Sequence, residues 1–317
     1  SLVCVAGMMV LTSFWYSRKV KIEPAVMTVP EIRREVASLL KLGFAFMASA
    51  LLTMGAAYVI RIIVIKQWGL EAAGLYQSAW ALGGVYVGFI LQAMGADFYP
   101  RLTASASNNA ECNRLVNEQA QISLLLAGPG VIGTLTFAPL VIHLLYSSKF
   151  GGAVEILRWI CLGMTLRVIA WPMGFIVLAK GWRQIFFWTE LAATIVHVGL
   201  AWVFVVNLGP KGAGMGFFGL YVWHGLLIYV IIRRLCGFRW STANKQLGRI
   251  FLPLIGIVFA GFYVLPFWPA TAIGTVAALL SGLYSVRVLL KLVELHRIPR
   301  PILQLLVRLR LAPPGAV

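Results

Sequence analysis

Long apolar runs separated by short polar segments form the main pattern of this chain. The first clear pair of runs is Leu42–Ile65 and Gly74–Ala96, which are joined by the polar turn Lys66–Ala73. Each run exceeds the ~20 residues that an α-helix needs to cross a hydrocarbon core. Asp97 and Pro100 follow the second run, and a charge with a proline is typical of a helix end at a water boundary. The pattern predicts a transmembrane helical hairpin.

The same pattern predicts six further crossings along the rest of the chain. These are Leu115–Tyr146, Val154–Ala179, Gln184–Val206, Gly214–Ile232, Leu247–Phe267 and Ala270–Leu290. We expect Gly128-Pro129-Gly130 to interrupt the first of them, because proline and glycine both disfavour a helix interior. With the hairpin, eight complete crossings follow residue 41, an even number that returns the chain to its starting side. The predicted fold class is an all-α polytopic membrane protein.

The segments outside these crossings have their own predictions. Leu2–Tyr16 is apolar but short for a full crossing, so we interpret residues 1–16 as the end of a truncated transmembrane helix of a longer protein. Residues 17–40 form a charged linker, in which Pro30 precedes apolar positions that predict a short amphipathic helix at the membrane surface. Residues 236–246 are predicted to be a loop, and residues 292–317 a basic tail.

Composition and charge agree with this class and predict an orientation. Hydrophobic residues make up 60% of the chain and charged residues only 12%, against about 25% in globular proteins, which excludes a soluble protein. The net charge of +17 would indicate nucleic acid in a soluble protein, but here the basic residues cluster at the ends of apolar runs. With the linker in the cytoplasm, 21 lysines and arginines lie on the cytoplasmic side and 4 on the periplasmic side. We therefore predict a cytoplasmic linker and C-terminus, and no nucleic-acid partner.

Two basic residues, Arg61 and Arg167, are the ones that we place inside crossings. A charge near the middle of a membrane helix costs at least about 2.5–3.5 kcal/mol, so Arg167 predicts a protein-lined aqueous cavity. The alternative is a structural arginine that donates hydrogen bonds to backbone groups freed by Pro172. Arg61 lies seven residues before Trp68, so its alternative is to reach outward to the interface.

The helical hairpin Val154–Val206 predicts neighbours for Arg167. Alignment at its turn places Arg167 level with His197, and places Glu190 nearer to the cytoplasmic boundary. We expect Glu190 to be a counter-charge of Arg167 or the acid of a proton-coupled carrier. His197 is expected beside Arg167, and ordinary hydrogen bonding between helices is its alternative role.

Other candidate chemistry is sparse in this sequence. Gln77 and Gln92 are polar positions within a span that either line a cavity or form hydrogen bonds between helices. The four cysteines are far apart, which predicts packing rather than a metal cluster or a disulfide framework. Gly84 and Gly88, and the glycines of Gly212–Gly216, are expected to allow close helix packing. No catalytic triad or metal-ligand pattern occurs, and we expect no cofactor and no enzyme.

Two segments of the first hairpin resemble a known family. Gly74-Leu75-Tyr76-Gln77-Ser78-Ala79-Trp80 and the segment from Tyr86 to Leu102 are similar to the O-antigen and polysaccharide flippases of the multidrug/oligosaccharidyl-lipid/polysaccharide exporter superfamily. The resemblance implies two six-helix lobes that alternate access, as in the related multidrug exporters. Residues 41–235 would be the second lobe, residues 1–16 the end of the first, and residues 247–291 two additional helices.

The resemblance also implies a function. Members of this family flip undecaprenyl-pyrophosphate-linked oligosaccharide, such as O-antigen units, across the bacterial inner membrane. Arg167 and Arg61 would then bind the anionic head group, because a guanidinium binds phosphate oxygens in a bidentate manner. The expected partners are this lipid-linked glycan and membrane lipids, with polysaccharide polymerase and chain-length proteins as further candidates.

Two other functions remain as alternatives. A cation-coupled multidrug exporter of the same superfamily would be expected to carry more intramembrane acids. A membrane-bound polysaccharide polymerase or glycosyltransferase would be expected to carry a large outer loop or an acidic nucleotide-sugar motif, and neither is visible in the sequence.

Overall fold

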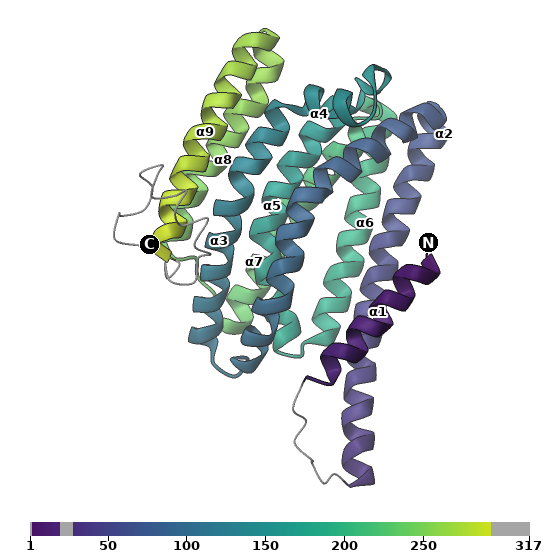
Figure 1. The fold of residues 1–317 in the computed structure, drawn as a ribbon, viewed down its shortest axis with the longest axis vertical. Coiled ribbons are helices and arrows are strands. Elements are labelled where there is room, and N and C mark those ends of the chain that lie inside the picture. The colour runs from purple at the N-terminus through teal and green to yellow at the C-terminus, as the bar shows by residue number, and fades with distance from the viewer. Residues whose placement is uncertain (1, 20–27, 293–317) are drawn as a thin grey trace. The chain divides into compact units, whose positions relative to one another are not determined.

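The computed structural model describes residues 2–19 and 28–292, and these form nine α-helices and one short 3-10 helix (Figure 1). The chain divides into two compact units, Ser1–Phe46 and Met47–Val317. The first unit contains α1 (Leu2–Ser17) and the start of α2 (Val29–Ala104). The predicted basic tail and part of the predicted linker lie outside the described residues.

Helix α2 begins with a capping interaction in the linker. The backbone N–H of Thr28 donates a hydrogen bond of 2.8 Å to Oε2 of Glu31, and the Thr28 hydroxyl donates a second one of 2.7 Å. These bonds favour the ionised carboxyl and lower the pKa of Glu31. The helix then continues from Val29 into the first predicted span, so the expected amphipathic helix is not a separate element.

A single glycine divides α2 into two crossings. The backbone of Gly69 has φ 83° and ψ 177°, which is non-helical and is essentially restricted to glycine. The apolar part, Met47–Ala104, has 58 residues and would be about 87 Å long if it were straight, nearly three times the thickness of a hydrocarbon core. The turn predicted over Lys66–Ala73 is therefore a sharp break at one residue.

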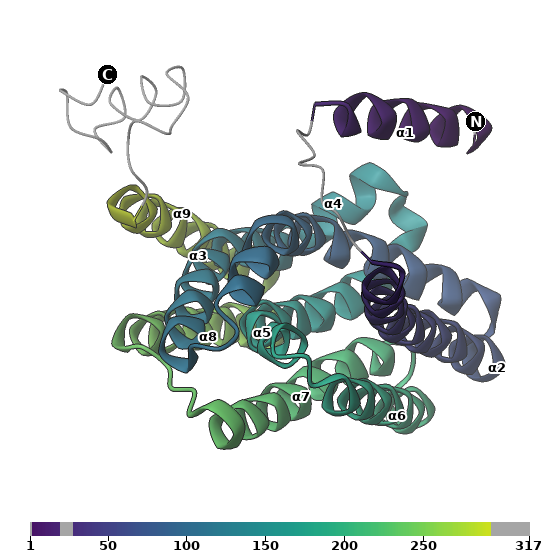
Figure 2. The same cartoon turned by 90° about the horizontal axis from the view of Figure 1, so that it is seen from below.

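Helix α5 (Ala153–Ala179) is the centre of the second unit. It packs between α3 (Asn109–Thr136) and α7 (Gly212–Cys236), and α6 (Arg183–Leu208) covers α7 (Figure 2). In the most apolar window of α5, 61% of the residues are buried, against 17–28% in α2 from Met47 onward, in α6 and α7, and in Thr242–Val264 and Phe267–Leu292. The outer helices thus expose apolar faces, as expected in contact with lipid.

The bend in the third predicted span lies later than the sequence predicted. Helix α3 stays helical through Gly128 and Gly130, and the chain bends by 75° between α3 and α4 (Ala138–Leu145). A Cβ on Gly128 would lie 2.3 Å from the ring of Phe251, and a Cβ on Gly130 would lie 2.0 Å from the ring of Tyr86. The two glycines therefore provide space for aromatic rings of neighbouring helices, and the predicted interruption at this point is wrong.

The glycines at the start of α7 allow equally close contacts. A Cβ on Gly212 would lie 2.2 Å from the backbone of Phe204, and one on Gly216 would lie 2.7 Å from the backbone of Ala201. Both contacts are with α6, so the two helices approach to backbone contact. A Cβ on Gly88 would meet no heavy atom within 4 Å, so the packing role expected for this glycine is not supported.

Helices α8 (Thr242–Val264) and α9 (Phe267–Leu292) pack on α3, on the far side from α6 (Figure 1). Asn117 of α3 holds the start of this hairpin. Its Oδ1 accepts hydrogen bonds from the backbone N–H of Ser241 at 2.7 Å and from Nδ2 of Asn244 at 2.9 Å. The loop before α8 is therefore tied to the core at one end of the bundle.

The described helices agree with eight predicted crossings. Helix α2 supplies two on either side of Gly69, the bent pair α3–α4 supplies one, and α5 to α9 supply five. The protein is an all-α polytopic membrane protein, as the sequence predicted.

Candidate functional site

Arg167 lies at the middle of the central helix. It follows Ala153 by 14 residues and precedes Ala179 by 12, so each end of α5 is about 18–21 Å away along the helix axis. Within the described residues, the Nε atom of Arg167 is buried and has no hydrogen-bond partner. An uncompensated donor at this depth is costly, which makes Arg167 a candidate ligand-binding residue.

The structure brings together the three residues that the hairpin alignment predicted to be neighbours. Arg167 interacts electrostatically with Glu190 and His197 of α6, seven and 14 residues after Arg183 at the start of that helix. It also interacts with Tyr221 of α7, whose ring centre lies 6.0 Å from its guanidinium carbon. Glu190 and His197 thus lie within electrostatic range of Arg167, and their roles stay predictions.

Glu190 faces Arg167 without forming an ion pair with it. In the described part of the chain, no N···O distance within 4.0 Å joins the two side chains. Oε2 of Glu190 instead accepts a hydrogen bond of 3.0 Å from the hydroxyl of Ser49 on α2. Ser49 was not predicted as a site residue, because its contact with Glu190 joins positions 141 residues apart in the sequence.

We call the residues Arg167, His197, Tyr221 and His224 the Arg167 cluster. Its two histidines lie on α6 and α7, respectively. His197 is only 8% exposed, and its Nε2 is a buried atom without a partner among the described residues. Its ring lies 5.8 Å from that of Phe217, which lies 5.0 Å from Tyr221. His224 lies 6.0 Å beyond Tyr221, and its Nδ1 is also buried without a partner in the described region. Tyr221 and His224 were missed at the sequence level, although a histidine within an apolar span was a signal.

Arg61 forms a separate, smaller site on α2. Its Nη2 donates a hydrogen bond to Oε1 of Gln77, which lies on the other side of the break at Gly69. Tyr76 is 3% exposed and lies within electrostatic range of Arg61. Gln77 is thus a partner of Arg61, whereas Gln92 is exposed and has no hydrogen bond among the described residues.

Another arginine, Arg158, lies within the central helix α5, although at the sequence level it was counted outside the crossings. It is in α5, five residues after Ala153, and is 8% exposed. Its guanidinium carbon lies 3.8 Å from the ring centre of Phe262 in α8, and its Nε donates a hydrogen bond of 3.4 Å to the carbonyl oxygen of Leu135. These contacts provide Arg158 with a structural role in holding α8 against α5.

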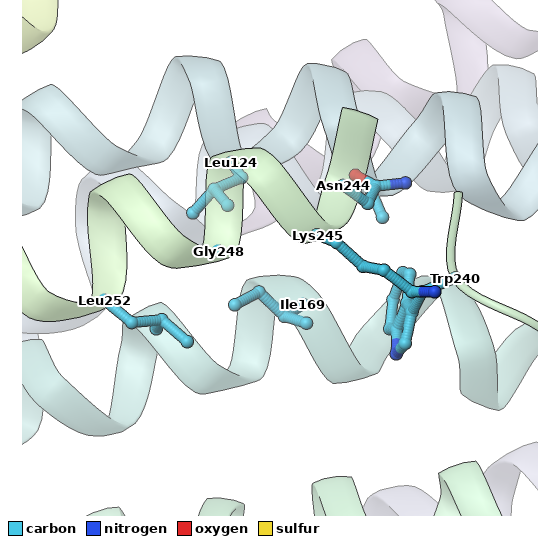
Figure 3. Close-up of a pocket in the computed structure, with 8 residues that line it drawn as sticks. Leu124, Ile169, Trp240, Asn244, Lys245, Gly248 and Leu252 are labelled. Atoms are coloured by element: carbon cyan, nitrogen blue, oxygen red, sulfur yellow. The ribbon is translucent and has the colours of Figure 1, made fainter. Parts of the chain in front are cut away.

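A pocket of about 200 Å³ lies between α3, α5 and α8 (Figure 3). Its wall is mostly apolar and includes Leu124, Ile169 and Leu252, with Lys245 near Trp240 at one end. It contains none of the predicted site residues. No group of three or more metal-ligating side chains occurs within the part of the chain that the structure describes.

The charges of the Arg167 cluster favour an anion. Arg167 carries a permanent positive charge, and the carboxylate of Glu190 within its electrostatic range is already bonded to Ser49. Arginine offers a planar fork of N–H donors that matches phosphate oxygens, and such charge-assisted bonds are roughly twice as strong as neutral ones. The cluster provides N–H donors for binding an anion.

Comparisons with known proteins match this chain to polysaccharide biosynthesis proteins and to flippases. Residues 3–155, just under half of the chain, match a family model described as polysaccharide biosynthesis protein. Two curated relatives are the lipid III flippases of Escherichia coli (strain K12) and Shigella flexneri. Each is 22% identical over 172 residues, which are 54% of this chain and 41% of the relative. The match therefore spans about two fifths of the length of these relatives.

A solved structure shares the fold. It is described as lipid II flippase MurJ in an inward closed conformation, and it superposes with a TM-score of 0.57 over 88% of this chain and 60% of that chain. The identity is 14%, so this match shows the fold alone. The family model and the two curated relatives support the resemblance to polysaccharide flippases that the first hairpin predicted.

Proposed function

We propose that this chain, a relative of the polysaccharide and lipid-precursor flippases, is part of a membrane flippase for a lipid-linked oligosaccharide. The observation that carries the proposal is the intramembrane cluster of Arg167, His197, Tyr221 and His224 on α5, α6 and α7. A transporter of an amphipathic anion needs a polar site at the middle of the membrane, and this cluster supplies donors there. The substrate proposed is an undecaprenyl-pyrophosphate-linked glycan such as an O-antigen unit.

Arg167 is the proposed contact for the pyrophosphate. Its partnerless Nε supports this role, because a bound phosphate oxygen would provide the missing acceptor. Arg61 is proposed as a second contact for the pyrophosphate as the head group moves toward the periplasm, since Arg61 lies eight residues before the break at Gly69. Gln77 would then hold the Arg61 side chain in place, and Gln92 would line the sugar path.

The proposed orientation puts the linker and the C-terminus in the cytoplasm of a bacterial inner membrane protein. In this arrangement residues 41–235 are the second six-helix lobe, and residues 247–291 are two additional helices. The membrane potential itself would favour outward movement of an anionic head group, by about 2.3 kcal/mol per charge for each 100 mV. Polysaccharide polymerase and chain-length proteins are proposed to act on the exported product.

Substitution of Arg167 tests the proposal in the full-length protein. We expect Arg167→Ala to abolish export of the glycan, and Arg167→Lys to retain part of it because lysine keeps the charge but loses the fork. Both variants should accumulate normally, since Arg167→Ala removes an intramembrane charge and Arg167→Lys adds none, so neither should hinder insertion. Surface polysaccharide and protein abundance should be measured in the same cells.

Arg158→Ala on the same helix is the matched control. Because Arg158 contacts Phe262 and Leu135 instead of the cluster, its replacement should lower abundance and export in parallel. Normal export by Arg167→Ala at normal abundance would remove Arg167 from the site. If Arg167→Ala left the amount of surface glycan normal but impaired the export of cationic drugs, the multidrug exporter would be favoured. Glu190 would then be the coupling acid.

A further inference from the structure

Glu190 is the acid nearest to the proposed anion site, and its position raises a physical problem. A carboxylate that can reach Arg167 competes with any anionic ligand for the same guanidinium. At short range in a site shielded from water, an arginine–carboxylate pair is strong. If the Glu190 carboxylate were free to move, it would therefore tend to pair with Arg167 and leave no guanidinium for the ligand.

The structure shows what keeps the two groups apart. Oε2 of Glu190 accepts the hydroxyl hydrogen of Ser49 at 3.0 Å, whereas no ion pair joins Glu190 to Arg167 among the described residues. The electrostatic interaction between the two charges persists across this separation. The Nε atom of Arg167 remains without a partner in the same described region. The acid is bonded to α2, and the guanidinium of α5 is left open.

We propose that Ser49 is a positioning residue that holds the Glu190 carboxylate away from Arg167 and so keeps the guanidinium available to a phosphate-bearing ligand. This inference rests on the proposed function and adds to it an acid that competes with the ligand and a hydroxyl that restrains the acid. Loss of the hydroxyl would leave Glu190 free to pair with Arg167 and to block the site from within.

The Ser49–Glu190 bond is accompanied by a second hydrogen bond between α2 and α6. Nε1 of Trp68 on α2 donates a hydrogen bond of 2.9 Å to the carbonyl oxygen of Val205 on α6, near the other end of that helix. Replacement of Ser49 should therefore leave the two helices in contact. A purely structural role for Ser49 would predict a loss of stability that Glu190→Gln cannot reverse.

The test measures binding of inorganic pyrophosphate to the purified full-length protein by calorimetry. Ser49→Ala should weaken binding by on the order of tenfold, which equals about 1.4 kcal/mol, since the released carboxylate would compete with pyrophosphate for the guanidinium. Glu190→Gln should bind at least as tightly as the original protein. The double variant Ser49→Ala/Glu190→Gln should recover the affinity of Glu190→Gln, because an amide does not compete for the guanidinium.

Thr53→Ala is the matched control on α2. The hydroxyl of Thr53 lies one turn beyond Ser49 and donates to the backbone carbonyl oxygen of Ser49, at 2.9 Å. Its removal should leave pyrophosphate affinity unchanged. Thermal melting without ligand should show that the Ser49→Ala protein is folded.

Three results would overturn parts of the proposal in distinct ways. Unchanged affinity in Ser49→Ala, with binding lost in Arg167→Ala, would reject the role of Ser49 and keep the anion site. Weak binding that persists in the double variant would show that Ser49 does not act through Glu190. Unchanged affinity in Arg167→Ala would reject the proposed site itself.

Discussion

Two arginines on one helix show how the surroundings of a charge separate structure from function. Arg158 and Arg167 both lie in α5, nine residues apart. Arg158 stacks on Phe262 and donates to a backbone carbonyl, so its charge is compensated by fixed groups. Within the described residues, Arg167 keeps a partnerless buried nitrogen beside an acid that is bonded elsewhere. The surroundings of Arg158 stabilise the fold, and those of Arg167 are suited to reversible binding of a ligand.

Arg158→Ala should destabilise the protein. The substitution removes the cation–π contact with Phe262, which is worth about 2 kcal/mol when desolvated, and leaves the carbonyl of Leu135 without its donor. We expect a lower melting temperature in detergent and a loosened α8–α9 hairpin. Arg158→Lys, which keeps a cation, should recover part of the loss. An unchanged melting temperature in Arg158→Ala would show that Phe262 does not hold α8 through this contact.

The sequence predicted the residues of the site within one hairpin but not those from other helices. His197 and Glu190 were found because the turn between α5 and α6 fixes which depths face each other. Ser49 and Tyr221 come from helices whose adjacency the hydrophobic pattern does not specify. Arg158 was counted outside the crossings, and its contact with Phe262, 104 positions away in the sequence, is visible only in the structure.

The helices show which local sequence signals predict the structure correctly and which are overridden by tertiary contacts. The predicted span Val154–Ala179 differs from α5 by one residue, because hydrophobicity and length determine where a helix crosses a membrane. Gly128-Pro129-Gly130 was a misleading signal. Glycine disfavours a helix on its own, yet here the rings of Phe251 and Tyr86 occupy the space it leaves. A tertiary contact therefore overrides the local preference.

Gly69 is the element-scale feature whose substitution has the clearest outcome. Its φ of 83° with ψ of 177° belongs to a region that side chains other than glycine's essentially do not enter. We expect Gly69→Ala to cost about 1–3 kcal/mol and to lower both abundance and melting temperature. The break between the two crossings of α2 would be strained or displaced.

Gly88→Ala is the control for this prediction, because it lies in the same α2 and a Cβ there meets no heavy atom within 4 Å. Alanine has the higher helix propensity, so this variant should be as stable as the original protein or more so. Equal melting temperatures for the two alanine variants would mean that the break tolerates another backbone conformation.

At the scale of the whole molecule, the ends of the bundle differ in charge. The connection before α3 and the connection after α4 lie at opposite ends of the bent pair (Figure 1). Under the proposed orientation, 21 lysines and arginines lie on the cytoplasmic side of the membrane and three on the periplasmic side, once Arg158 is placed within α5. An excess of this size on one side is the property that determines membrane orientation.

Cysteine labelling tests this orientation. Ser107 and Ser148 are both exposed, one before α3 and one after α4, and α3 alone is about 42 Å long. In a variant without the four native cysteines, an impermeant thiol reagent added to intact cells should label Ser148→Cys and leave Ser107→Cys unmodified. Opening the membrane should then expose Ser107→Cys, which controls for its reactivity. Labelling of Ser107→Cys from outside would place the basic end of the bundle in the periplasm, and the anionic head group would then have to move toward the 21 basic residues instead of away from them.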